Sequence, residues 1–195
     1  ARLERYGVLM IADEIQTGFG RTGRMFAIEH FDVVPDIISM AKALGNGIPI
    51  GAFATTDHIA ASLNRPSAST FGGNPVSSVT GMAVLEYIRE ERLVERSEEL
   101  GHILKQGLEQ LMIRHGAVLS EVRGKGLMIG VELLASNPDL GAIFTDQVLE
   151  EMKEVGILIG KNGISRNVLA FQPPLVIQDE DIQKMLKELD VVLGR

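Results

Sequence analysis

The sequence predicts an α/β fold, and two patterns along its 195 residues carry that prediction. Short, continuously apolar runs have the composition of strands buried on both faces of a mainly parallel sheet, and they lie at 7–12, 36–41 and 48–55. From residue 76 the pattern changes to apolar residues at spacings of three and four, which is typical of amphipathic helices. We place a domain boundary near residue 96, between residues 1–96 and a smaller α+β domain at 97–195.

The remaining elements follow in chain order. The segment RMFAIEHF, which ends before Pro35, predicts a short helix, and residues 76–113 predict helix throughout. After Gly116 we expect a strand in VLSEVRGKGLMIGVELL, a helix near 145–155, the strands ILIG and VLAF, and a helix from Asp179 to Leu193.

Composition excludes several classes of partner and site. A net charge of −7 argues against a nucleic-acid partner, and the absence of cysteine excludes disulfides and thiolate metal sites. The four histidines lack metal-ligand spacing, so no metal is expected. No apolar run approaches the roughly 20 residues of a membrane span, and we expect a cytoplasmic protein without a membrane partner. Because the sequence begins at Ala1 in a strand-like segment, we expect a C-terminal fragment of a longer chain.

The glycines Gly18, Gly20 and Gly23 have the spacing of a dinucleotide-binding turn. In such a turn the first glycine directly follows the strand, whereas here Ala12 to Thr17 intervene and bring Asp13 and Glu14 to the strand end. Asp36 lies at a suitable distance along the chain for a ribose contact, although it opens an apolar run instead of ending one. A dinucleotide-binding oxidoreductase is therefore the alternative from a different class.

Lys42 differs from the other lysines because it follows an apolar strand and precedes a glycine-rich turn. Burial there would favour the neutral amine, which suits imine chemistry with a carbonyl, although a lysine at a strand end can also extend to solvent. Asp13 at the end of one strand and Lys42 at the end of the next match the needs of pyridoxal phosphate. This cofactor requires a lysine for a Schiff base and an acid that keeps its ring nitrogen protonated.

Four segments together make the family recognisable: ADEIQTGFGRTG, PDIISMAKALGNGIPIGA, STFGGNPVSSVTGMAVLE and VRGKGLMIGVELL. Over almost the whole chain they resemble the class III (omega) aminotransferases, which are fold type I pyridoxal phosphate enzymes, and most closely the alanine–glyoxylate type. The resemblance implies that 1–96 is the C-terminal part of the large cofactor-binding domain and 97–195 the small domain. It also implies a homodimer with the active site at the interface.

The resemblance assigns roles to individual residues. Asp13 is expected against the pyridinium nitrogen, Gln16 near the phenolic oxygen, and Lys42 as the Schiff-base lysine. Ile15 is expected to pack on one ring face, and Thr70 to contact the cofactor phosphate across the dimer interface. Glu14 is either part of this site or a structural acid at the strand end.

The implied reaction is a ping-pong transfer of an amino group from an amino acid or omega-amine to a 2-oxo acid such as pyruvate or glyoxylate. Arg123 either meets a substrate carboxylate or braces a strand. Ala170 stands where many family members carry an arginine, which puts dicarboxylate recognition by that route in doubt. Racemase, decarboxylase or phospho-lyase chemistry on the same scaffold stays open, and the fragment alone is expected to be inactive.

Overall fold

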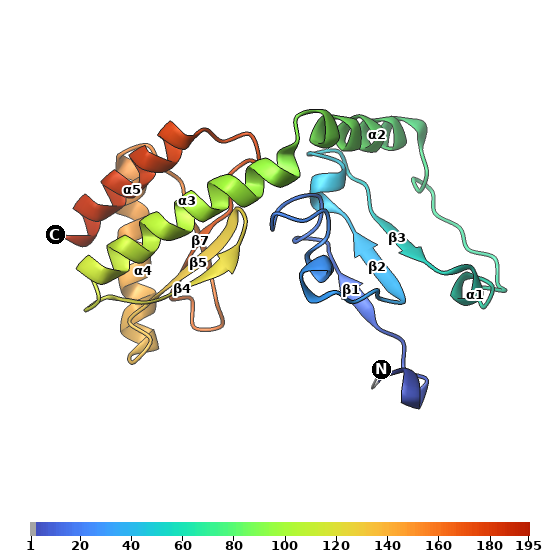
Figure 1. The fold of residues 1–195 in the computed structure, drawn as a ribbon, viewed down its shortest axis with the longest axis horizontal. Coiled ribbons are helices and arrows are strands. Elements are labelled where there is room, and N and C mark those ends of the chain that lie inside the picture. Colours follow the sequence, from blue (N-terminus) through green and yellow to red (C-terminus); the bar gives the residue numbers. More distant parts are fainter. Residues whose placement is uncertain (1–2) are drawn as a thin grey trace. The chain divides into compact units, whose positions relative to one another are not determined.

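The computed structural model describes residues 3–195. The chain divides into two compact units, Ala1–Glu95 (unit 1) and Arg96–Arg195 (unit 2), each with a β-sheet of its own (Figure 1). Within the described residues no helix combines the length and apolar character of a membrane span.

Unit 1 contains a three-stranded sheet in the order β1 (Ile11–Asp13), β2 (Ile37–Met40) and β3 (Ala52–Thr55). β1 and β2 are parallel, whereas β3 runs antiparallel to β2. The short connection between β2 and β3 explains the reversal, because a parallel pair needs a crossover of a dozen or more residues. The expected burial on both faces is not met within this chain, since Ile11 is 62% exposed and Phe53 66% exposed.

The helical elements of unit 1 are short except for the last one. They are η1 (Glu4–Tyr6), η2 (Ala27–Phe31), η3 (Lys42–Leu44), α1 (Asp57–Ala60) and α2 (Pro75–Glu90). The short helix predicted in RMFAIEHF is therefore present as the 3₁₀ helix η2. At the start of α2 the Asn74 side chain accepts a hydrogen bond from the Ser77 N–H at 3.0 Å, and Pro75 occupies the first helical position.

The single helix expected over 76–113 is two helices in the structure. The helical conformation is interrupted between α2, which ends at Glu90, and α3 (Leu93–Arg114). Arg92 lies in this break with a φ of 51°, a left-handed conformation that an α-helix cannot continue through. The apolar spacing is interrupted here by the four charged residues at 89–92, which the prediction of one continuous helix did not take into account.

Unit 2 contains a four-stranded antiparallel sheet in the order β4 (Leu119–Lys125), β5 (Met128–Leu133), β7 (Val168–Phe171) and β6 (Gly160–Asn162). The single strand expected in VLSEVRGKGLMIGVELL is thus a hairpin that turns at Gly126 and Leu127. The helix expected near 145–155 is longer, since α4 (Pro138–Glu154) begins at the Asn137 cap.

The core of unit 2 lies between this sheet and helices α3, α4 and α5 (Asp179–Leu193). The predicted stripe of α3 is confirmed, because Leu100, Leu104, Leu108 and Leu111 are all buried. The other elements add their own buried side chains, among them Val131, Leu133, Val148, Met152, Leu169, Ile182 and Leu189.

Candidate active site

Asp13 and Lys42 lie at the same edge of the sheet in unit 1. Asp13 ends β1, and Lys42 follows β2 as the first residue of η3. Because β1 and β2 are parallel, with Asp13 opposite Ser39, their carboxyl ends meet at one edge. This is the edge at which open α/β sheets bind ligands. Both side chains are exposed in this chain, so the expected burial of Lys42 is not observed.

Direct hydrogen bonds organise this edge. The Asp13 Oδ1 accepts hydrogen bonds from the Ile15 N–H at 3.1 Å and from the Ser39 hydroxyl at 3.3 Å. The Lys42 Nζ donates a hydrogen bond to the Gln16 Oε1 at 3.0 Å. Residues up to 26 positions apart are thus brought together at the strand ends. We name Asp13, Gln16, Ser39 and Lys42 the strand-end cluster.

Ser39 is the member of the strand-end cluster that sequence reasoning missed. The available signal was its polarity, because it is the polar residue inside the apolar run IISM of β2. Its position three residues before Lys42 places it beside the lysine in sequence, but its partner Asp13 is revealed only by strand pairing.

The turn after Lys42 is tightly constrained. Lys42 has a φ of 42°, a conformation that non-glycine residues seldom adopt and that surrounding structure must hold in place. Leu44 is buried, and a Cβ at Gly45 would lie 2.0 Å from the carbonyl oxygen of Ile48. Helix α2 packs on η3, with Gly81 facing Leu44. The base of the Lys42 side chain is therefore held by close backbone packing.

Glu14 acts as a structural acid. It is 3% exposed, and its carboxylate accepts hydrogen bonds from the N–H groups of Ala27 at 3.0 Å and Ile28 at 2.7 Å. The Thr17 hydroxyl donates a further hydrogen bond to it. Glu14 thus ties the end of β1 to the start of η2, 13 and 14 residues away along the chain.

The same contacts explain the glycine fingerprint. Gly20 and Gly23 have φ values of 90° and 84° and allow a compact loop, inside which the buried Phe19 meets Phe26 edge to face at 5.7 Å. A dinucleotide turn would leave helix-start N–H groups for a pyrophosphate, but Glu14 binds those of η2. The dinucleotide interpretation therefore fails, because a side chain of the protein occupies the place of the phosphate.

The Asp36 side chain also has a structural role, as a hydrogen-bond acceptor for the backbone before β1. Its Oδ2 accepts a hydrogen bond from the Met10 N–H at 2.7 Å, just before β2 begins. That position is at the amino end of the strand, opposite the edge that carries Lys42. The ribose contact considered for Asp36 is wrong for this reason.

Thr70 lies in the irregular segment that leads to α2. The Gly72 N–H donates a hydrogen bond to the Ser69 hydroxyl at 3.0 Å, and Gly73 has a φ of 70°, so the chain turns tightly just after Thr70. Among residues 3–195 the exposed Thr70 side chain makes no hydrogen bond and does not join the strand-end cluster. Its phosphate contact stays a prediction.

Arg123 lies on β4 of unit 2 and contacts two carboxylates. Its Nη1 donates hydrogen bonds to Glu121 at 2.5 Å and to Glu132 at 2.7 Å. The hydrogen bond with Glu132 raises the pKa of Arg123, and the same bond lowers the pKa of Glu132. The buried Asn167 amide donates to the other oxygen of Glu132 at 3.4 Å. These contacts support the bracing role, while the substrate contact of Arg123 stays a prediction.

Two histidines bind neighbouring groups in the fold. His30 Nε2 lies 3.0 Å from the carbonyl oxygen of Thr22, and His115 Nε2 lies 2.7 Å from Asp190. Hydrogen bonding by His115 lowers the pKa of Asp190. In the part of the chain that the structure describes, no three His, Asp or Glu side chains converge as metal ligands.

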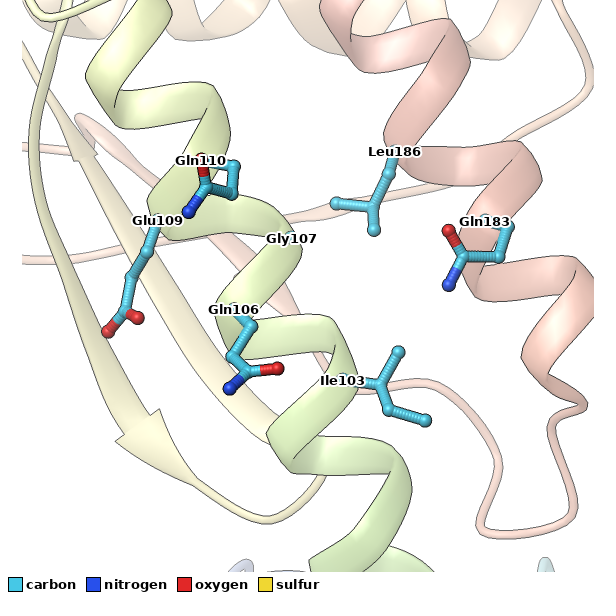
Figure 2. Close-up of a pocket in the computed structure, with 7 residues that line it drawn as sticks. All are labelled: Ile103, Gln106, Gly107, Glu109, Gln110, Gln183 and Leu186. Carbon is cyan, nitrogen blue, oxygen red and sulfur yellow. The ribbon is translucent and has the colours of Figure 1, made fainter.

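Unit 2 has a hollow of about 500 Å³ between α3 and α5 (Figure 2). Its lining comes mainly from amide and apolar side chains, namely Ile103, Gln106, Gly107, Glu109, Gln110, Gln183 and Leu186. It is wide open, and none of the predicted site residues line it. The strand-end cluster therefore stays the candidate site.

Comparison with known proteins identifies a family. Residues 3–193 match the family model described as aminotransferase class-III. The chain is 42% identical to alanine–glyoxylate aminotransferase 2 homolog 2, mitochondrial, of Arabidopsis thaliana, covering 99% of this chain and 41% of that protein. It is also 42% identical to an acetylornithine aminotransferase of Caldanaerobacter subterraneus, covering 96% of this chain and 45% of the relative. The chain thus spans less than half the length of these relatives.

Relatives with other named activities are similar to the same degree. A leucine/methionine racemase of Thermococcus litoralis is 40% identical, covering 96% of this chain and 42% of the racemase. A solved phospholyase from Arthrobacter, in complex with phosphoethanolamine, superimposes with a TM-score of 0.91 at 38% identity, covering 99% of this chain and 47% of that one. The predicted fold is confirmed by this likeness, which extends over both units.

Proposed function

The chain belongs to the class III aminotransferase family, and from this premise we propose that the whole protein is a pyridoxal-phosphate-dependent transaminase. The single observation that carries the proposal is the placement of Asp13 and Lys42 at the carboxyl ends of adjacent parallel strands. A carboxylate and an amine at one open edge form the donor set that this cofactor needs.

The residues of the strand-end cluster fit the cofactor in chemistry. Lys42 would hold it covalently, Asp13 would face its ring nitrogen, and Gln16 would lie near its phenolic oxygen. Ile15, which is half-buried beside Asp13, would pack on a ring face. When bound, pyridoxal phosphate supplies an electron sink for a substrate carbanion.

Lys42 and Asp13 divide the proton chemistry between them. The Lys42 amine would take up the proton of the donor carbon as general base and would give it back as general acid. The Asp13 carboxylate would face the ring nitrogen and favour its protonated form. Ile15 N–H and Ser39 keep that carboxylate in one orientation by donating to its Oδ1.

The proposed assembly is a homodimer whose active site is completed by the partner. The exposed Thr70, in a tight turn before α2, is free to donate its hydroxyl to a phosphate held by the other subunit. With an amino donor and a 2-oxo acid as partners, catalysis is proposed for the full-length protein and not for these 195 residues alone. A cytoplasmic location stays a prediction, and one relative is named as mitochondrial.

The proposed substrates are an amino acid or omega-amine as donor and pyruvate or glyoxylate as acceptor. A monocarboxylic acceptor suits Ala170, whose methyl group offers no charge to a second carboxylate. The names of the racemase and phospholyase relatives favour a second candidate, namely another pyridoxal phosphate reaction on the same scaffold.

A spectrum tests the cofactor proposal. Full-length protein with added pyridoxal phosphate should show a visible absorption band that sodium borohydride removes, and Lys42→Ala should lack it. Lys125→Ala, at an exposed lysine of unit 2, is the matched control and should keep the band. A band of equal intensity in Lys42→Ala would contradict the assignment of the lysine.

An assay tests the reaction. Incubation of the full-length protein with alanine and glyoxylate should yield pyruvate and glycine in equal amounts, with parallel-line kinetics for the two substrates. Cofactor binding without any amino transfer to pyruvate or glyoxylate would reject transamination with these acceptors. Racemised alanine in the same mixture, or phosphate released from added phosphoethanolamine, would instead support the second candidate.

A further inference from the structure

The two charged groups at the strand ends of unit 1 are each held by a neutral partner. Asp13 accepts from the Ile15 N–H and the Ser39 hydroxyl, and Lys42 donates to the Gln16 side chain. Between residues 3 and 195, no ion pair joins Asp13 to Lys42, although both are exposed at one edge of the sheet. The carboxylate and the amine thus each bond to a neutral group at this edge, although opposite charges attract one another.

The register of β1 and β2 places Ser39 within hydrogen-bond distance of the Asp13 carboxylate. It stands directly opposite Asp13 in the parallel pair, with its Oγ 3.3 Å from the carboxylate Oδ1. The Ile15 N–H, two residues further along the chain, donates to the same oxygen at 3.1 Å. Two donors on one oxygen restrict the carboxylate far more than one would, because each fixes a different direction.

We propose that Ser39 is a positioning residue that keeps the Asp13 carboxylate from pairing with the Lys42 amine. This inference rests on the proposed function, in which the amine attacks a carbonyl and the carboxylate serves a ring nitrogen. A nearby carboxylate stabilises the protonated form of an amine, which is not nucleophilic. An ion pair at the strand ends would therefore disable both groups at once.

β2 and β3 carry no charged side chain, and α2, which packs on η3, carries none from Pro75 to Leu85. Glu14 is buried, and its carboxylate is bound by Thr17 and by backbone N–H groups of η2. The Ser39 hydroxyl donates its hydrogen bond to Asp13, so we expect its loss to act on Lys42 through the Asp13 carboxylate.

The test measures Lys42 without the cofactor. Full-length protein freed of pyridoxal phosphate is reductively methylated with formaldehyde and borane from pH 6 to 10, and modification of Lys42 is followed by peptide mass spectrometry. The exposed Lys125 and Lys184 serve as references in the same digest. Ser39→Ala should raise the pH of half-maximal modification of Lys42 by about half a unit, because the released carboxylate favours the protonated amine.

Two further variants separate positioning from general damage to the fold. Ser39→Thr keeps the hydroxyl and should restore the original pH profile, whereas in an Asp13→Asn background Ser39→Ala should change nothing. An unchanged profile in Ser39→Ala, or a shift that persists with Asp13→Asn, would overturn the inference. Because no cofactor is present, failure here is distinguishable from failure of the proposed function, which the borohydride-sensitive band tests separately.

Discussion

Unit 2 buries its apolar side chains with its own residues, whereas unit 1 leaves many of them exposed. In unit 2, Leu104, Leu108 and Leu189 are at most 1% exposed. In unit 1, Phe71 is 81% exposed and Ile11 62% exposed, although the strand runs are as apolar as those of a sheet interior. The comparison teaches that an apolar run predicts a buried segment. The residues that cover the segment can belong to another part of the protein.

Separating the two units should give the largest effect. A polypeptide of residues 91–195 should unfold cooperatively with a free energy of about 5–10 kcal/mol, because its core is complete. A polypeptide of residues 3–90 should unfold without a sharp transition, since it buries few large side chains. Urea titration followed by circular dichroism measures both. A sharp unfolding transition in residues 3–90 would contradict the claim that unit 1 lacks a complete core of its own.

Truncating one core leucine should give the next largest effect. Leu108→Ala should lower the free energy of unfolding by about 2–5 kcal/mol, because the Leu108 side chain lies fully inside the core of unit 2. Leu158→Ala removes the same atoms from a residue that is 84% exposed and should cost less than about 0.5 kcal/mol. Equal losses in the two variants, measured by urea unfolding, would contradict the assigned core.

Glu14 is the buried polar contact on which the loop of unit 1 depends. Glu14→Gln should destabilise this loop by about 1–3 kcal/mol, because an amide offers one acceptor oxygen where the carboxylate serves two N–H groups and a hydroxyl. Hydrogen exchange at the Ala27 and Ile28 amides should accelerate accordingly. Glu90→Gln, at an exposed residue of α2, should leave their exchange rates unchanged.

Arg123 should give the smallest effect, and one that depends on pH. Arg123→Gln should cost about 1 kcal/mol or less at neutral pH, because the ion pairs are partly exposed. The pKa of Glu132 is lowered in the fold, so its contribution is present above the ordinary value of 4.5 and is lost as the pH falls through the lowered pKa. The stability difference between the variant and the parent should therefore vanish in acid.

The same variant decides between the two roles of Arg123. A bracing residue should leave the KM for the amino donor within about twofold of the parent value, whereas a carboxylate contact should raise it at least tenfold. Lys125→Gln removes a positive charge from the same strand and is the control for general electrostatic effects. A tenfold rise in KM confined to Arg123→Gln would overturn the bracing role.

Local sequence patterns predicted those helices and strands whose apolar spacing is visible within the element itself. The helix at Asp179–Leu193 and the strand at Val168–Phe171 were expected at these positions from apolar spacing and composition. The hairpin at Gly126 was missed, because GKG was taken as part of one continuous strand. The break at Arg92 was missed because a left-handed residue can be of almost any type when tertiary packing holds it.

The sequence by itself determined the family and the positions of Asp13 and Lys42 at strand ends, because the motifs that carry them are runs of neighbouring residues. Only the tertiary structure decided that Glu14 binds η2, that Ser39 holds Asp13, and that β3 runs antiparallel to β2. The residues joined in these contacts and strand pairings lie at least 12 positions apart in the chain. Residues at such separations become hydrogen-bond partners only when the loop between them closes in the folded protein. A local pattern of residues does not show which loops close.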